Sequence, residues 1–156
     1  MDKIIRYIHN RLLYTQKTLS VAESCTGGLT SKILTDFPGS SRYFILGVIT
    51  YSNESKIKIL GIPAKLIAKK GAVSKEIAEK MAYSIRRIAK TDYGIGITGI
   101  AGPTGATADK PVGRVFIAVS NNKKVISKKF LFKGKRTSIR NQASLNSLKL
   151  LKSLLK

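Results

Sequence analysis

Residues 45–56 limit most strongly what this chain can fold into. The stretch opens with the apolar run of residues 45–49, which is typical of a buried strand. The pattern then breaks at residues 50–53, where hydroxyl and amide side chains can cap a new helix. Tyr51 and Lys56 are therefore predicted at a junction between a strand and a helix. Such a junction can hold side chains rigidly at the edge of a cleft.

A lysine at this junction has two interpretations. As one of many surface lysines it is a solvated charge in a first helical turn, which is the common state of this residue type. Partial desolvation would instead lower its pKa and make the neutral amine a usable base. To be half neutral at pH 7, Lys56 needs a pKa lowered by about three units, or about 4 kcal/mol of differential environment.

The rest of the chain alternates between strand and helix patterns. Apolar residues at helical spacing predict helices over residues 2–15, 29–34, 56–60, 63–70, 74–88 and 136–155. Short β-prone runs predict strands over residues 18–22, 43–49, 93–98, 112–120 and 124–132. The last two runs are joined at Asn121-Asn122, which is a hairpin signal. We expect one domain over residues 1–156, an α/β chain with a three-layer α/β/α architecture and a mixed sheet.

Two glycine-containing turns follow predicted strands. In residues 23–28, strand, polar turn and helix succeed one another, an order that exposes backbone N–H groups to an anion or oxyanion. We expect the N–H groups of Gly27 and Gly28 to hold the oxyanion, although such turns are also common without function. Residues 99–105 form a loop suited to pressing backbone against a ligand. Ser41, in the turn before residues 43–49, could face the same cleft or be an ordinary turn serine.

The composition excludes several classes of site. Cys25 is the single cysteine and His9 the single histidine, so an intrachain disulfide and metal sites rich in these residues are not supported. No apolar run has the length of a membrane span, and the N-terminus lacks the apolar core of a signal peptide. A cytoplasmic protein with no membrane partner and no metal is the resulting expectation.

The net charge is unusual. The chain carries 29 Lys and Arg against 8 Asp and Glu, for a formal charge of +21. A charge of this size attracts polyanions, so a nucleic-acid partner is an alternative to consider. The basic residues are, however, spread along the chain rather than gathered in one tail, and general amino-acid usage can account for part of them.

Six short motifs occur along the chain: ESCTGG (23–28), PGSS (38–41), GVITYSNESK (47–56), GAVS (71–74), TGIAGP (98–103) and KPVG (110–113). Together, in this order and spacing, they resemble the CinA C-terminal domain family, which is also found free-standing as the PncC nicotinamide-nucleotide amidases. The resemblance covers the whole chain. Nothing in it resembles the molybdopterin-binding-like N-terminal domain of full-length CinA proteins.

The resemblance implies hydrolysis of the carboxamide of nicotinamide mononucleotide (NMN) to nicotinate mononucleotide and ammonia, without a cofactor. It also implies a homo-oligomer with a small nucleotide as its substrate. The residues that the resemblance assigns to catalysis are Ser24, Ser41, Tyr51 and Lys56. Those assigned to the substrate, by the resemblance or by position in the two turns, are Thr26, Gly27, Gly28, Thr98, Gly99, Gly102 and Arg136. Two positions depart from the family pattern, because Lys135 replaces an aspartate before Arg136 and Ser55 replaces an alanine before Lys56.

Amide hydrolysis needs a nucleophile, a base and an oxyanion site. Our hypothesis is that a neutral Lys56 activates Ser24, with Ser41 as a relay or alternative nucleophile and Tyr51 passing protons. Cys25 would compete as nucleophile only if its thiol had a lowered pKa. Arg136 is the candidate for the substrate phosphate. The rival hypotheses are a non-catalytic basic binding module and an amidase for a different pyridine or nucleotide substrate.

Overall fold

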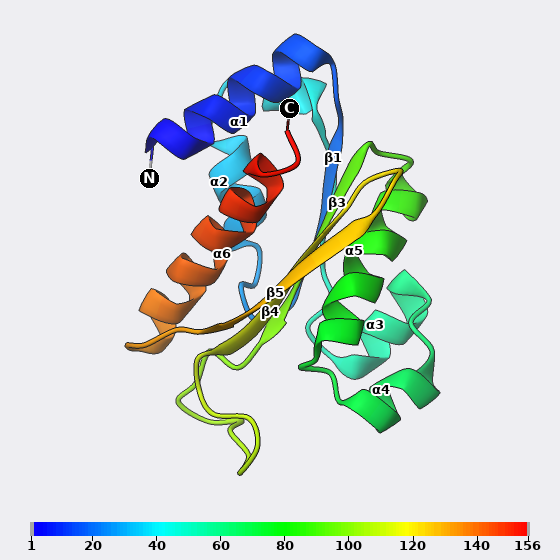
Figure 1. Ribbon diagram of the computed structural model, residues 1–156, viewed down its shortest axis with the longest axis vertical. Helices are drawn as coiled ribbons and strands as arrows, with labels where there is room; N and C mark the ends of the chain where they lie inside the picture. The colour runs from blue at the N-terminus through cyan, green and yellow to red at the C-terminus, as the bar shows by residue number, and fades with distance from the viewer. Residues whose placement is uncertain (1, 156) are drawn as a thin grey trace.

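A five-stranded sheet between two layers of helices forms the fold in the computed structural model, which describes residues 2–155 (Figure 1). The elements in chain order are α1 (Asp2–Thr15), β1 (Leu19–Glu23), α2 (Leu29–Thr35), the 3-10 helix η1 (Ser40–Arg42), β2 (Phe44–Ile49), α3 (Asn53–Leu60), α4 (Ala64–Lys70), α5 (Lys75–Ala89), β3 (Tyr93–Gly99), β4 (Arg114–Ser120), β5 (Val125–Leu131) and α6 (Arg136–Lys152). The predicted elements are therefore present, with boundaries that move by a few residues.

The sheet is mixed, as the sequence predicted. Its strand order is β2-β1-β3-β4-β5, with β1 parallel to both β2 and β3, and with β4 antiparallel to both β3 and β5. The two antiparallel strands at the end are the predicted hairpin, which closes where the Asn121 N–H donates to the Lys124 carbonyl. Helical crossovers place β1, β2 and β3 in parallel, so their carboxyl ends meet at one edge of the sheet.

Helices cover both faces of the sheet (Figure 1). The helices α1, α2 and α6 lie on one face, and α3, α4 and α5 lie on the other. Each face has its own apolar core: Leu12 and Leu148 belong to the first, Met81 and Ile85 to the second. The expected three-layer α/β/α architecture is confirmed.

The central strand β3 lies unusually close to α5. A Cβ atom added to Gly94 or Gly96 would come within 2.3 Å of the carbonyl oxygen of Ala82 or Ala78. Only glycine allows this approach, because any side chain would overlap the helix backbone. The alternation of glycine and isoleucine in β3 thus fixes the depth at which α5 packs.

The strand β2 is less buried than predicted. It lies at the edge of the sheet, and its residues alternate between half-buried and exposed, with Ile45 and Ile49 51% and 54% exposed. The apolar run predicted a strand covered on both faces, but an edge position leaves one face only partly covered. The prediction of a strand was right, and the prediction of its full burial was wrong.

Within residues 2–155, no helix is both long enough and apolar enough to cross a membrane. In the same range, no three His, Cys, Asp or Glu side chains come together in the way that a metal ion would require.

Candidate active site

The candidate site lies where the three parallel strands end. Ser24 follows β1, Tyr51 follows β2, and the loop of residues 100–105 follows β3. In open α/β sheets, ligands bind at the carboxyl ends of the strands. A cavity of about 280 Å³ lies here, lined by Ser24, Cys25, Tyr51, Asn53, Lys56, Ala72, Val73, Thr98, Gly99, Ile100, Ala101, Gly102, Thr104, Gly105 and Arg136.

Lys56 reaches the hydroxyl of Ser24 from the first turns of α3. Ser52 begins this helix by accepting a hydrogen bond from the Ser55 N–H at 3.0 Å. Lys56 then points inward and is only 1% exposed. Its Nζ lies 3.0 Å from Ser24 Oγ, 2.8 Å from the Thr50 carbonyl oxygen and 3.3 Å from the Tyr51 carbonyl oxygen. The solvated-lysine interpretation is therefore wrong for this residue.

The surroundings of Lys56 raise the fraction of neutral amine above that of an ordinary lysine. Burial lowers the pKa of Lys56 to about 8, because the ammonium ion loses its hydration. A neutral amine has two N–H groups and one lone pair. As an ammonium group, Lys56 donates to Ser24 Oγ and to the carbonyl groups of Thr50 and Tyr51; as a neutral amine that keeps the two carbonyl bonds, it would turn its lone pair toward Ser24 Oγ. This arrangement can accept a proton from the hydroxyl.

The turn after β1 is held by the carboxylate of Glu23, which is fully buried. Glu23 accepts hydrogen bonds from the N–H groups of Gly28, Thr30 and Ser31 at 3.1, 3.1 and 2.8 Å, and from the Ser31 hydroxyl at 2.7 Å. The start of α2 is thus neutralised by the chain's own carboxylate rather than left open for a ligand.

The predicted oxyanion donors are therefore wrong. The Gly28 N–H is bonded to Glu23, and the Gly27 N–H donates to the Ser24 carbonyl oxygen at 3.0 Å. Both glycines are required for a different reason, since their φ angles of 59° and 93° are in the left-handed region that other residues rarely adopt. They shape the turn and do not line the cavity.

Cys25 is a poor rival to Ser24. Its side chain is buried, and burial raises the pKa of the thiol to about 12. The reactive thiolate is therefore a negligible fraction at neutral pH. Ser24, by contrast, has a base within hydrogen-bonding distance.

Arg136 and Tyr51 form one wall of the cavity. Arg136 Nη1 donates to the Gly102 carbonyl oxygen at 2.8 Å, and Nη2 donates to the Tyr51 hydroxyl at 2.9 Å. Tyr51 meets Lys56 only through its backbone carbonyl, so its hydroxyl does not bridge Lys56 and Ser24. The side chain of Tyr51 is 57% exposed and stands at the mouth of the site.

The end of β3 and the loop after it lie against the cavity, as predicted for Thr98, Gly99 and Gly102. The Thr98 hydroxyl, however, donates to the Ala72 carbonyl oxygen at 2.8 Å, so it ties β3 to the segment before α5. That segment brings Ala72 and Val73 into the cavity. Ala72 and Val73 belong to the GAVS motif of residues 71–74, for which the sequence indicated no role.

Besides Gly27 and Gly28, two more residues with predicted roles lie outside the cavity lining. Ser41 is exposed in η1, which precedes β2, whereas the cavity lies beyond the other end of that strand. Thr26 is fully buried in the turn after Ser24. Asn53 lines the cavity and had been considered only as a helix cap, whereas Thr104 and Gly105 line it as members of the predicted ligand loop of residues 99–105. Their positions depend on how the loops fold back over the sheet, which local patterns do not reveal.

Larger grooves lie elsewhere on the surface, among them the following two. One, of about 410 Å³, runs between β5 and α6 past Phe130 and Leu150. The other, of about 630 Å³, is bordered by α1 and α2 and includes Phe37 and Pro38. Neither contains a serine next to a buried base, so chemistry rather than size identifies the site.

The chain matches one protein family over nearly its whole length. The family model for the CinA C-terminal domain matches residues 1–155. A CinA-like protein of Leptospira biflexa is 48% identical over 156 residues, covering 99% of this chain and 37% of its own length. One from Geotalea uraniireducens is 50% identical over 123 residues, covering 79% of this chain and 29% of its own length. The chain thus spans about a third of the length of these curated relatives.

Solved structures show the same architecture over nearly the whole chain. The competence/damage inducible protein CihA from Agrobacterium tumefaciens superposes with a TM-score of 0.96 and 33% identity, covering 99% of this chain and 94% of that one. A competence or damage-inducible protein from Enterobacter asburiae gives 0.94 and 31%, with 98% and 96% coverage. The chain therefore belongs to the CinA C-terminal domain family.

Proposed function

We propose that this domain is an amidohydrolase that converts NMN to nicotinate mononucleotide and ammonia by a serine–lysine mechanism. The observation that carries the proposal is a buried Lys56, with a pKa lowered to about 8, whose Nζ lies 3.0 Å from Ser24 Oγ in a cavity. The cavity volume suits a small ligand rather than a macromolecule. The choice of NMN as the substrate rests on the resemblance of the motifs to those of the nicotinamide-nucleotide amidases.

The proposed reaction has two halves. Ser24 Oγ attacks the carboxamide carbon while its proton passes to Lys56, and the resulting ammonium group of Lys56 donates that proton to the amide nitrogen as the C–N bond breaks and ammonia leaves. The acyl group is then bound to Ser24. Water, deprotonated by Lys56, attacks the same carbon, and the proton returns to Ser24 as nicotinate mononucleotide leaves. The Tyr51 hydroxyl accepts a hydrogen bond from Arg136, and its O–H group is the proposed donor to the substrate.

The direct test is ammonia release from NMN, with nicotinamide and NAD measured in parallel under the same conditions. We expect rapid release from NMN and little from the other two, because the proposal requires both the carboxamide and the accessible 5′-phosphate. Release from another pyridine nucleotide but not NMN would transfer the proposal to that substrate. No release from any of them would overturn it.

The pH profile should follow the ionisation of Lys56. The neutral amine is the base, so kcat/KM should rise about tenfold per pH unit below pH 8 and level off above it. Initial rates between pH 6 and pH 9.5 would measure this, with thermal unfolding at each pH as a control for folding. A profile that is flat across this range is incompatible with Lys56 as the base.

Arg136 should act mainly on substrate binding. It reaches the mouth of the cavity, and only two of its five N–H groups are used in the bonds to Gly102 and Tyr51. Arg136→Ala should raise KM for NMN about tenfold to a hundredfold, the cost of a lost charge-assisted contact with phosphate. A fall in kcat with KM unchanged would contradict a phosphate-binding role.

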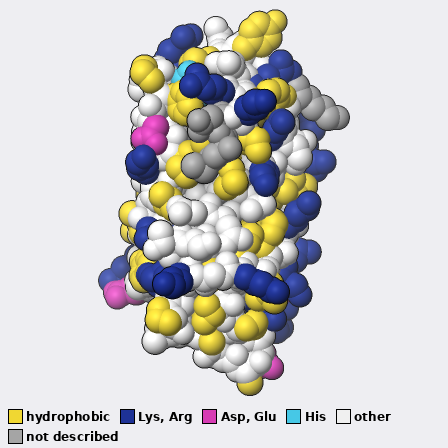
Figure 2. All heavy atoms as spheres, turned by 90° about the vertical axis from the view of Figure 1, so that its left-hand side faces the viewer, with side chains coloured by type: hydrophobic (Ala, Val, Ile, Leu, Met, Phe, Trp, Pro, Cys, Tyr) yellow, Lys and Arg dark blue, Asp and Glu magenta, His cyan; other side chains and the backbone are white. Residues whose placement is uncertain are grey.

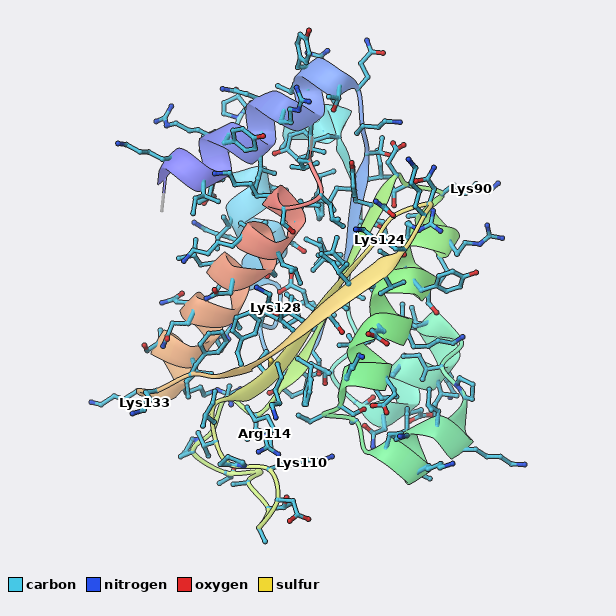
Figure 3. The ribbon with its side chains drawn as sticks, viewed as in Figure 1. Lys90, Lys110, Arg114, Lys124, Lys128 and Lys133 are labelled. Atoms are coloured by element: carbon cyan, nitrogen blue, oxygen red, sulfur yellow. The ribbon has the colours of Figure 1, made fainter. Side chains whose placement is uncertain are left out.

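A second candidate function is binding of a polyanion, with or without catalysis. Figure 2 shows basic side chains gathered along one edge of the molecule. Among the residues labelled in Figure 3, Lys124 lies directly before β5, Lys128 lies on it and Lys133 lies shortly after it. Among residues 2–155, the five ion pairs involve other lysines. Steeply salt-dependent binding of DNA without ammonia release would favour this function. Binding of a polyanion alone would not explain the pairing of Ser24 with Lys56. We therefore conclude in favour of the amidase function.

A further inference from the structure

An arginine of α6 holds the turn that carries Ser24. Arg140 lies four residues after Arg136, and its Nε and Nη2 atoms both donate to the Thr26 carbonyl oxygen, at 3.2 and 2.7 Å. Arg140 does not line the cavity, so it cannot act by touching the substrate. We propose that Arg140 is a positioning residue that orients the Cys25 N–H as the oxyanion donor. This inference rests on the proposed amidase function and deepens it.

The backbone N–H groups near Ser24 differ in whether they already have a hydrogen-bond acceptor. The Ser24 N–H donates to the Ile97 carbonyl oxygen at 3.0 Å, and those of Gly27 and Gly28 are bonded to Ser24 and Glu23. Within residues 2–155, the N–H groups of Cys25 and Thr26 have no hydrogen-bond acceptor. Of these two residues, only Cys25 lines the cavity. The N–H of the residue after a nucleophilic serine is a recurrent oxyanion donor in serine hydrolases.

Two rigid peptide groups connect the Cys25 N–H to Arg140. A peptide group is planar and trans, so fixing its carbonyl fixes the direction of the N–H that follows. Arg140 fixes the Thr26 carbonyl and therefore the Gly27 N–H. The Gly27 N–H donates to the Ser24 carbonyl oxygen at 3.0 Å, which in turn fixes the Cys25 N–H. Each link is a hydrogen bond or a peptide plane, with no flexible side chain between Thr26 and Cys25.

The charge of Arg140 also acts on these two peptide groups. The guanidinium charge polarises the Thr26–Gly27 peptide group, which makes the Gly27 N–H a stronger donor to the Ser24 carbonyl oxygen. That bond in turn polarises the Ser24–Cys25 peptide group, because linked hydrogen bonds strengthen one another. The Cys25 N–H then presents a larger partial positive charge to a developing oxyanion. Arg140 would thus stabilise the transition state more than the bound substrate.

The experiment compares kcat and KM for NMN in Arg140→Ala, Arg140→Lys and the wild-type chain. Loss of an oxyanion donor costs about 10²- to 10³-fold in kcat, so loss of its positioning should cost less, about tenfold to thirtyfold in Arg140→Ala. KM should stay within about threefold of the wild-type value. Arg140→Lys keeps the charge with fewer hydrogen bonds and should recover part of kcat. Arg136→Ala, one helical turn away, should show the opposite split.

Arg87→Ala is the matched control, because Arg87 is an exposed arginine of α5 remote from the motifs of the site. It should leave kcat and KM unchanged. If Arg140→Ala does not fold, by its thermal unfolding transition, Arg140→Lys carries the test. Wild-type kcat in a folded Arg140→Ala, or in Arg140→Lys where only that variant folds, would overturn the inference. So would a rise in KM alone.

A second measurement separates this inference from the identity of the substrate. A fluorophosphonate reacts with an activated serine by forming an O–P bond to Ser24 and expelling fluoride, and the phosphonyl oxygen occupies the oxyanion position. The rate of Ser24 labelling, followed by mass spectrometry, should fall about tenfold in Arg140→Ala and not at all in Arg87→Ala. If NMN is not hydrolysed but this difference is found, the proposed substrate fails and the role of Arg140 stands. Equal labelling rates in all three proteins would reject that role.

Discussion

Lys56→Met should abolish ammonia release while making the folded domain more stable. The methionine side chain is close in length to that of lysine but cannot accept a proton, so kcat/KM should fall about 10³-fold or more. At the same time, it removes an ammonium group that is buried at 1% exposure and whose pKa is lowered to about 8. A buried group that is needed for catalysis commonly lowers the free energy of unfolding in this way.

The sign and the size of the stability change follow from proton linkage. The pKa of Lys56 is about 8 in the folded state against 10.5 for the ordinary side chain. Below pH 8 both states are protonated and the full cost of burying the charge, at most about 3 kcal/mol, is present. Losing hydrogen bonds to the Thr50 and Tyr51 carbonyl groups offsets part of this gain, so about 1–2 kcal/mol should remain.

Denaturant unfolding of both proteins at pH 7 and at pH 10 would measure this effect. Between pH 8 and 10.5 the unfolded wild-type chain binds more protons than the folded one, so the advantage of Lys56→Met should shrink as pH rises. Lys58→Met is the matched control, because Lys58 is an exposed lysine of the same helix, paired only with Glu54. It should change neither activity nor the pH dependence of unfolding. Full activity in Lys56→Met would refute the mechanism.

Ser24→Ala should reduce turnover by about 10⁴-fold or more, since removal of a nucleophile that acts together with its base costs nearly the whole covalent pathway. The variant should remain folded, because Ser24 Oγ bonds only to Lys56 Nζ among residues 2–155. Single-turnover incubation of the wild-type chain with NMN, quenched in acid, should trap a nicotinate mononucleotide ester on the peptide that contains Ser24. The variant should trap none.

Two further variants identify the nucleophile. Cys25→Ser should keep most of the activity, because burial raises the pKa of the thiol to about 12 and leaves it in the unreactive protonated form. Ser41→Ala should also keep it, since Ser41 is exposed in η1 and does not line the cavity. Loss of activity in Ser41→Ala with Ser24→Ala still active would reverse the assignment and would require a second copy of the chain to bring Ser41 to the site.

The sequence by itself determined the order of the elements, the mixed sheet and the hairpin near its end. These features depend on residues that are neighbours along the chain, as in the glycine–isoleucine alternation of β3 and the capping serines before α3 and α5. The motifs also identified Ser24 and Lys56 as candidates. Their resemblance to one family was confirmed by the match over residues 1–155.

The tertiary structure alone decided which of these candidates meet. Ser24 and Lys56 are 32 residues apart in the chain, and they come within 3.0 Å because β1 and β2 are parallel neighbours whose carboxyl ends coincide. The tertiary structure also pairs Tyr51 with Arg136, which is 85 residues away in the chain. It also leaves β2 exposed at the sheet edge. Such pairings depend on strand order and on which donors are already bonded, and neither is encoded in a local pattern of residues.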